Sequence, residues 1–259
     1  IQSPLIPGST YKTMTLLAGL DSGKVHMDDL FYNDHKVNHF QAIGPVTIGT
    51  GNESETFGLN GVGNNLEPYT TRFPVTLRYG YTHSDNIIFA QVGAQMIGAN
   101  TWLEYNRRFY IGQRIPFDLP VAVSTVSPYK DGHLPINLLA EDSFGQGKNQ
   151  ITPLEMTLID NAIANNGNLM RPSLIMKIVD PTGTTVLSNS PQSLGTPISD
   201  TTASQVRDGM YGVVQCGSGR FGPTGPDNVA IPQYTPLLDT SPYAIIAKTG
   251  TGEVGGGFG

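Results

Sequence analysis

The chain has 259 residues, of which 38% are hydrophobic and 14% charged, and its formal net charge is −6 at pH 7. This composition suits one large or two small globular domains, and the negative charge argues against nucleic acid or an anionic membrane surface as a partner. The single cysteine, Cys216, excludes an internal disulfide and a zinc site made of several cysteines. No apolar run approaches the roughly 18 residues that span a bilayer.

Helical periodicity recurs along the chain. We predict helices over 9–23, 84–98, 100–112, 152–167 and 201–215. The segment 152–167 has the clearest signals, because Pro153 lies in its first turn and Gly167 follows its end. The helix within 84–98 is expected to begin just after Ser84.

Strand signals are fewer and most of them come late. Residues 24–74 are rich in Gly, Asn and Thr and are predicted to form a long irregular excursion with a β-like piece at 44–51. Two short strands are predicted within 174–188, around a turn at 180–183. An apolar strand with a Gly-rich end is predicted over 243–254.

The first predicted helix carries a serine and a lysine one turn apart. Ser9 and Lys12 are neighbours on a helix surface, so the lysine amine can reach the serine hydroxyl. A lysine that is desolvated and close to other cations can lose its proton and act as a base. Amide groups at a helix N-terminus also favour negative charge on Ser9. A capping serine followed by a solvated lysine is the alternative.

Two further motifs follow in the chain. Ser84-Asp85-Asn86 stands just ahead of an apolar helix, and Lys248-Thr249-Gly250 ends an apolar strand. Alone, the first motif is compatible with a simple helix cap and the second with a strand-to-turn junction. The ordered set S-x-x-K, S-D-N and K-T-G is a signature of penicillin-binding proteins and class A β-lactamases.

With these motifs the chain resembles the transpeptidase domain of penicillin-binding proteins, most closely the class B high-molecular-weight type. Further similar segments are PGSTYK (7–12), SFGQG (143–147), ITPLEM (151–156) and DGMYGVVQCGSG (208–219). The resemblance implies an α/β (α+β) fold over residues 1–259, in which a five-stranded antiparallel sheet is flanked by helices.

The resemblance also implies a reaction. Ser9 is expected to attack the carbonyl between the two D-alanines of a peptidoglycan stem peptide and to form an acyl-enzyme. Lys12 is expected to take the Ser9 proton. Ser84 is expected to relay a proton to the leaving amine, and Asn86 to hydrogen-bond the substrate amide and position Lys12.

The remaining site residues would hold the substrate. Lys248, Thr249, Gly250 and Thr251 are expected to bind the terminal carboxylate of the stem peptide or of a β-lactam. The backbone N–H groups of Ser9 and Thr251 would form the oxyanion hole. No metal and no cofactor is expected. Expected partners are stem peptides, β-lactam antibiotics and proteins of cell-wall synthesis or division, with no nucleic acid.

Other functions share parts of this pattern. A class A β-lactamase needs a glutamate that activates the deacylating water, and neither Glu104 nor Glu141 lies in the E-x-x-L-N context of that glutamate. A class D enzyme or a non-catalytic β-lactam sensor would carry S-x-V where this chain has Asn86. A D,D-carboxypeptidase stays open as an alternative.

The resemblance implies more sheet than this sequence contains. Two strands are expected before the S-x-x-K helix, and two strands with a C-terminal helix after K-T-G, but eight residues precede Ser9 and eight follow Thr251. We therefore expect a fragment of a longer protein that an N-terminal segment anchors at the extracytoplasmic face of a bacterial membrane. A lone strand over 243–254 would expose both of its edges, so the isolated chain is expected to be unstable.

Overall fold

The computed structural model describes residues 3–31, 46–48, 55–57, 74–128, 134–219, 244–254 and 257–258. Side chains are described in all of these ranges except 46–48, 55–57, 253–254 and 257–258. No helix in these ranges is long and apolar enough to cross a membrane.

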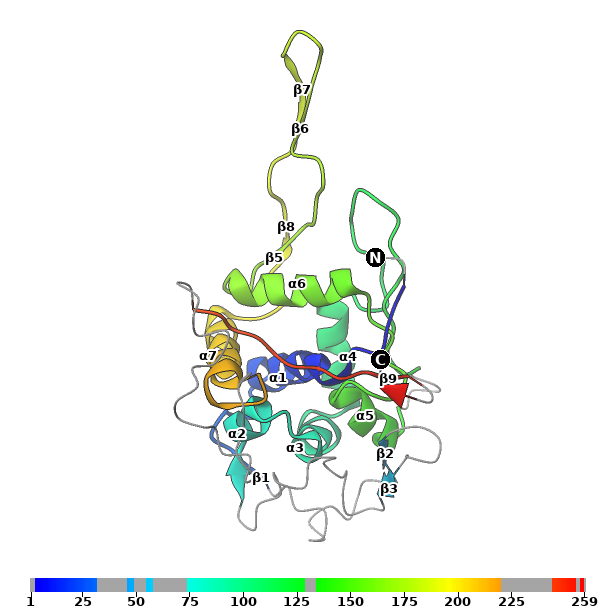
Figure 1. Cartoon of the computed structure of the whole chain (residues 1–259), viewed down its shortest axis with the longest axis vertical. Coiled ribbons are helices and arrows are strands. Elements are labelled where there is room, and N and C mark those ends of the chain that lie inside the picture. Colours follow the sequence, from blue (N-terminus) through cyan, green and yellow to red (C-terminus); the bar gives the residue numbers. More distant parts are fainter. Residues whose placement is uncertain are drawn as a thin grey trace.

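The helix α1 (Lys12–Asp21) lies in the middle of the molecule and follows the 3₁₀ turn η1 (Gly8–Tyr11), as the sequence predicts (Figure 1). Every residue of α1 except Asp21 is buried, and α1 contacts helices on several sides. A helix buried all round needs partners for its polar side chains. Accordingly, the hydroxyl of Thr13 pairs with Tyr81 Oη at 2.9 Å and that of Thr15 donates to the carbonyl of Ser143 at 2.8 Å.

Other helices surround α1 (Figure 1). They are α2 (Leu77–Thr82), α3 (Asn86–Gln91) with its π-helical continuation η4 (Val92–Ile97), α4 (Ala99–Arg108), α5 (Ile136–Ser143), α6 (Pro153–Ala164) and α7 (Asp200–Cys216). The predicted helices over 84–98, 100–112, 152–167 and 201–215 are confirmed. Neither α2 nor α5 was predicted, because helices of six and eight residues show little periodicity.

Several helices begin at a side-chain cap. Thr76, Asp85, Thr152 and Ser199 each accept a hydrogen bond from the backbone N–H three residues ahead, at the starts of α2, α3, α6 and α7. Such caps satisfy a helix N–H that has no partner within the helix. The start of α3 matters most for the site, because Asp85 lies between Ser84 and Asn86.

The described strands form antiparallel pairs. The pairs are β1 (Leu30–Phe31) with β4 (Val75–Thr76), β2 (Val46–Ile48) with β3 (Glu55–Phe57), β5 (Leu169–Met170) with β8 (Ser193–Gly195), β6 (Lys177–Val179) with β7 (Thr185–Ser188), and β9 (Glu253–Val254) with β10 (Gly257–Phe258). The predicted pair around the turn at 180–183 is confirmed as β6 and β7, and β2 lies within the predicted piece at 44–51. The rest of the predicted excursion over 24–74 lies largely outside the described residues.

The predicted strand over 243–254 is wrong for most of its length. Residues 244–252 have no strand assignment, and only Glu253–Val254 form a short strand. Within the described ranges this segment lies against helices and turns: Ala247 N–H donates to the carbonyl of Met210 in α7 at 3.4 Å. An extended apolar segment becomes a strand only when another strand pairs with it.

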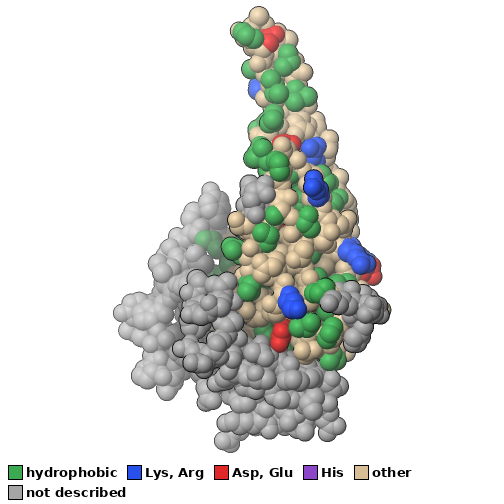
Figure 2. Space-filling model, turned by 90° about the vertical axis from the view of Figure 1, so that its right-hand side faces the viewer, with side chains coloured by type: hydrophobic (Ala, Val, Ile, Leu, Met, Phe, Trp, Pro, Cys, Tyr) green, Lys and Arg blue, Asp and Glu red, His purple; other side chains and the backbone are tan. Residues whose placement is uncertain are grey.

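The strands β5–β8 and β6–β7 build an arm that projects from the helical body (Figure 1). Hydrophobic side chains lie exposed along it (Figure 2). They are Leu174, Ile175, Met176, Ile178, Val179, Val186 and Leu187. A two-stranded ribbon with no packed face is marginally stable in isolation, and the outer pair β6–β7 is exposed throughout. At the base of the arm, Leu169 of β5 is buried in the core.

Candidate active site

The amine of Lys12 contacts four oxygen atoms. Its Nζ lies 2.7 Å from Ser9 Oγ, 2.8 Å from the Ser84 carbonyl, 3.3 Å from Ser84 Oγ and 2.5 Å from Asn86 Oδ1. The lysine side chain is fully buried. An ammonium has only three hydrogens to share among these four oxygens, whereas a neutral amine has a lone pair that can accept the Ser9 hydroxyl proton.

Several effects set the charge of Lys12. Burial lowers its pKa well below the usual range for lysine, and the nearby charge of Lys248 lowers it further, while the charge of Asp85 acts in the opposite direction. A lowered pKa makes the neutral amine accessible near neutral pH. Lys12 is therefore equipped to be a base toward Ser9.

The three residues of the S-D-N motif at the start of α3 have two roles. Asp85 is buried and caps α3, with Oδ1 accepting from Ile88 N–H at 3.1 Å. Ser84 and Asn86, on either side of it, contact Lys12. Ser84 has a left-handed backbone conformation (φ 62°), which is costly for a residue other than glycine and is often found at functional sites. The helix-cap interpretation of this motif holds for Asp85 alone.

Lys248 approaches the same serine from the other side. Its Nζ lies 2.7 Å from Ser84 Oγ and 3.0 Å from the Thr249 carbonyl, and 5.7 Å from the centre of the Tyr81 ring. Burial lowers the pKa of Lys248 to about 7. The Ser84 hydroxyl thus bridges the two lysine amines.

Small residues let the K-T-G segment lie directly against η1. A Cβ added to Gly8, whose φ is +57°, would overlap the Thr251 carbonyl oxygen, and a Cβ on Gly250 would lie 2.6 Å from Thr10 Cγ2. The backbones of Gly8 and Thr251 therefore approach each other directly beside Ser9. This places Thr251 beside the serine with which it was predicted to form the oxyanion hole.

Three residues at the site were not singled out from the sequence. Gln146 Nε2 donates to the Thr251 carbonyl at 3.3 Å, the hydroxyls of Ser218 and Thr249 are 2.6 Å apart, and the Tyr81 ring lies below Lys248. Gln146 belongs to the segment SFGQG and Ser218 to CGSG, so the resemblance of these segments was the available signal. For Tyr81 the sequence offers no such signal.

Among the residues that the structure describes, no group of three or more His, Cys, Asp or Glu side chains could hold a metal ion. His83, one residue before Ser84, stacks on Tyr79 with ring centres 4.0 Å apart and contacts the Tyr79 carbonyl through Nδ1 at 3.1 Å.

A cavity of about 580 Å³ adjoins Lys248. It lies between α6, α7 and residues 246–248, and Thr10 and Thr13 line it as well. Ser9, Ser84 and Asn86 do not line it, so the cavity lies beside the catalytic candidates and does not contain them.

The site and fold define a class of protein. Residues 1–258 match the family model described as the penicillin binding protein transpeptidase domain. The chain belongs to this family, and the predicted family and fold class are confirmed.

Particular relatives support this. Penicillin-binding protein PbpB of Mycolicibacterium smegmatis is 26% identical over 98% of this chain and 34% of its own length. Peptidoglycan D,D-transpeptidase PbpA of Mycobacterium tuberculosis is 30% identical over 68% of this chain and 32% of its own length. The chain thus spans about one third of these relatives.

Solved structures are also similar. The D,D-transpeptidase domain of a peptidoglycan glycosyltransferase from Eggerthella lenta is 27% identical with a TM-score of 0.71, over 99% of this chain and 56% of that one. Penicillin-binding protein A from M. tuberculosis, as a penicillin G acyl-enzyme complex, is 25% identical with a TM-score of 0.65, over 82% of this chain and 44% of that one.

Proposed function

We propose that this chain is the catalytic domain of a peptidoglycan D,D-transpeptidase and that Ser9 forms an acyl-enzyme with a stem peptide ending in D-Ala-D-Ala. The observation that carries the proposal is the set of contacts of Lys12 Nζ with Ser9 Oγ, Ser84 Oγ and Asn86 Oδ1. The name of PbpA and the acyl-enzyme structures of penicillin-binding protein A support the same class of reaction.

Acylation begins at Ser9. Its Oγ attacks the carbonyl carbon of the penultimate D-alanine while its proton passes to the neutral amine of Lys12. The developing oxyanion is stabilised by the backbone N–H groups of Ser9 and Thr251. One such donor is worth about 10² to 10³ in rate.

Ser84 completes this step. The C–N bond to the terminal D-alanine breaks, and the leaving amine takes the Ser84 hydroxyl proton while Ser84 regains one from Lys12. The contacts of Ser84 Oγ with both lysine amines support this relay. Protonated Lys248, with Thr249 and Thr251, binds the terminal carboxylate of the substrate.

Deacylation reverses these roles. The acceptor amine of a second stem peptide loses a proton by way of Ser84 and Lys12 and attacks the ester carbonyl, so that an amide forms and Ser9 Oγ recovers its proton. A β-lactam would acylate Ser9 by the same route. Because peptidoglycan is assembled outside the cytoplasmic membrane, we place the domain at the extracytoplasmic face of the cell, where other cell-wall synthesis proteins are possible partners.

An exchange reaction separates transpeptidase from the alternatives. The chain is incubated with an N-acylated peptide ending in D-Ala-D-Ala and with ¹⁵N-labelled D-alanine, and the peptide is weighed by mass spectrometry. Transpeptidation puts the label into the peptide, and Ser9→Ala abolishes this. Release of D-alanine without labelled peptide would instead assign a D,D-carboxypeptidase, and neither product in a chain shown to be folded would contradict the proposal.

A further inference from the structure

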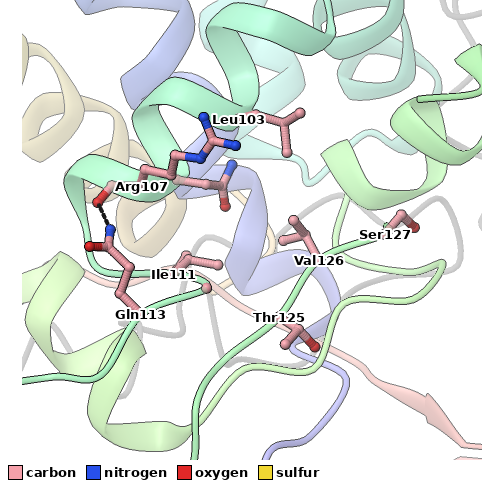
Figure 3. A pocket seen from close by; sticks show the side chains of 9 residues that line it. Leu103, Arg107, Ile111, Gln113, Thr125, Val126 and Ser127 are labelled. Atoms are coloured by element: carbon pink, nitrogen blue, oxygen red, sulfur yellow. Dashed lines mark hydrogen bonds between the residues drawn. The ribbon is translucent and has the colours of Figure 1, made fainter. Parts of the chain in front are cut away.

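A second cavity lies beside α4, away from the predicted site residues. Its volume is about 430 Å³, within the range of small-molecule pockets. It lies between α4 and the segment 111–127 (Figure 3). None of the predicted catalytic or substrate-binding residues lines it.

The lining has an apolar part and a cationic part. Leu103, Ile111 and Val126 supply the apolar surface, and Arg107 points across the same space (Figure 3). Arg107 is the one ionisable side chain in the lining, so no carboxylate of the described residues neutralises it there. Within the described ranges its guanidinium has no hydrogen-bond or ion-pair partner. An apolar pocket with one free guanidinium matches a ligand that has an apolar body and a carboxylate.

Two contact routes lead from this pocket to the nucleophile. Asn106, in the lining, accepts a hydrogen bond from the hydroxyl of Tyr11, the residue before Lys12. It also donates to the Trp102 carbonyl at 2.7 Å, which fixes its orientation. A change in the Asn106 wall therefore reaches the start of α1 through a single hydrogen bond.

The second route runs through α5. Ser127, on the opposite wall, donates from both N–H and Oγ to the buried carboxylate of Asp142, each at 3.0 Å. Asp142 accepts through its carbonyl from Gly145 N–H at 3.1 Å. A Cβ on Gly145 would overlap the Gly8 carbonyl, so this loop packs against the turn that presents Ser9.

We propose that this pocket binds a small organic carboxylate with an aliphatic or aromatic body, and that its occupancy changes the rate at which Ser9 is acylated. The binding half stands on the pocket alone. The regulatory half rests on the proposed function, because it needs acylation at Ser9.

Binding is tested with N-acetyl-L-leucine as the probe and N-acetyl-L-leucinamide as its uncharged control, by isothermal titration calorimetry on the chain. We expect the acid to bind saturably with a dissociation constant of about 1 mM or below, and the amide to bind more weakly. Arg107→Gln should weaken binding of the acid at least about tenfold, because a charge-assisted hydrogen bond is lost. Arg78→Gln, which removes an exposed cation from α2, should leave it unchanged.

A second variant guards against loss of fold. Val126→Phe fills the apolar part and should weaken the acid and the amide alike, with an unchanged circular dichroism spectrum. No saturable binding to an unaltered chain that circular dichroism shows to be folded, or equal binding by Arg107→Gln, overturns the proposed pocket. An acylation rate constant for penicillin G that is the same with and without saturating N-acetyl-L-leucine overturns the regulatory half, and a change of twofold or more that Arg107→Gln removes supports it.

Discussion

At the scale of single residues, the site depends on a buried amine, that of Lys12, and a half-buried one, that of Lys248, which share one hydroxyl. Lys12 and Lys248 both contact Ser84 Oγ, and burial lowers the pKa of each. Positive charge on one amine disfavours positive charge on the other. In the proposed mechanism this arrangement supplies a neutral Lys12 as base, while the substrate carboxylate favours the charged form of Lys248.

Replacing Lys12 tests the base directly. Lys12→Met keeps a side chain of similar length but removes the proton acceptor, so the acylation rate constant for a fluorescent penicillin should fall by about 10² to 10⁴. Stopped-flow fluorescence measures this constant. Lys177→Met, on the exposed strand β6, is the matched control and should acylate at the unaltered rate; an equal loss in both variants would contradict the assignment.

The pH profile tests the coupling of the two lysines. Acylation should fall as the pH drops through the pKa of Lys12, because the protonated amine cannot accept the Ser9 proton. The charge of Lys248 helps to keep that pKa low, so Lys248→Gln should raise it and move the acid limb of the profile to higher pH. The measurement is the second-order acylation rate constant against pH. An acid limb that stays in place or moves to lower pH is the contrary result.

At the scale of elements, the site depends on the fit between η1 and residues 250–252. Gly8 and Thr251 approach so closely that no Cβ fits between them, and Gln146 holds the Thr251 carbonyl. These contacts join three segments that are far apart in the sequence.

A pair of glycine substitutions isolates this fit. Gly8 and Gly23 both have positive φ, but a Cβ on Gly23 meets nothing within 4 Å. Both Gly→Ala variants should lose about 1 kcal/mol of unfolding free energy from backbone strain, with a further loss for Gly8→Ala from overpacking. Only Gly8→Ala should lose penicillin acylation, by tenfold or more, as urea denaturation and stopped-flow kinetics would measure. Equal acylation by both variants would show that the close approach is not required.

The elements also show what sequence can predict. The contact of Ser9 with Lys12 is local, since two residues one turn apart on a helix must be neighbours, and it was predicted. The strand over 243–254 was predicted from its apolar residues, yet pairing depends on a neighbouring strand, which local periodicity does not reveal.

Long-range contacts were not predicted either, because local periodicity does not reveal which distant segments meet. Nothing in the spacing of Ser84 and Lys248 predicts that they meet; only the family motifs suggested it. The contacts of Gln146 and Ser218 with the K-T-G segment, and the pocket beside Asn106, depend on how distant helices pack. Local sequence patterns do not indicate which of these distant residues lie close together.

At the scale of the whole molecule, the core contains carboxyl groups whose burial disfavours the ionised form. Glu155 is fully buried, and both of its carboxylate oxygens have no hydrogen-bond partner within the described ranges. Burial raises the pKa of Glu155 to about 8 and that of Asp142 to about 7.

This makes stability depend on pH with a definite sign. The unfolded chain releases the Glu155 proton near the ordinary glutamate pKa, whereas the folded chain keeps it up to about pH 8. The folded state therefore binds more protons between these values, and its unfolding free energy falls as pH rises, by about 1.4 kcal/mol per pH unit for one such group.

Glu155→Gln should remove this contribution. The slope of unfolding free energy against pH should flatten, and at about pH 8 the variant should melt at a higher temperature than the unaltered chain. Thermal melts over a pH series measure both effects. Glu104→Gln, an exposed site on α4, should keep the original slope; a variant at Glu155 that keeps it as well would argue against a buried neutral carboxyl.

The most direct test of the central claim is the intact mass of the chain after incubation with penicillin G, followed over hours beside a Ser9→Ala control. We predict one stable covalent adduct on the unaltered chain and none on the control. Circular dichroism on the same samples shows that both are folded. No adduct on a folded chain, an adduct on the control, or an adduct that disappears within seconds as hydrolysed drug accumulates would contradict a transpeptidase that acts through Ser9.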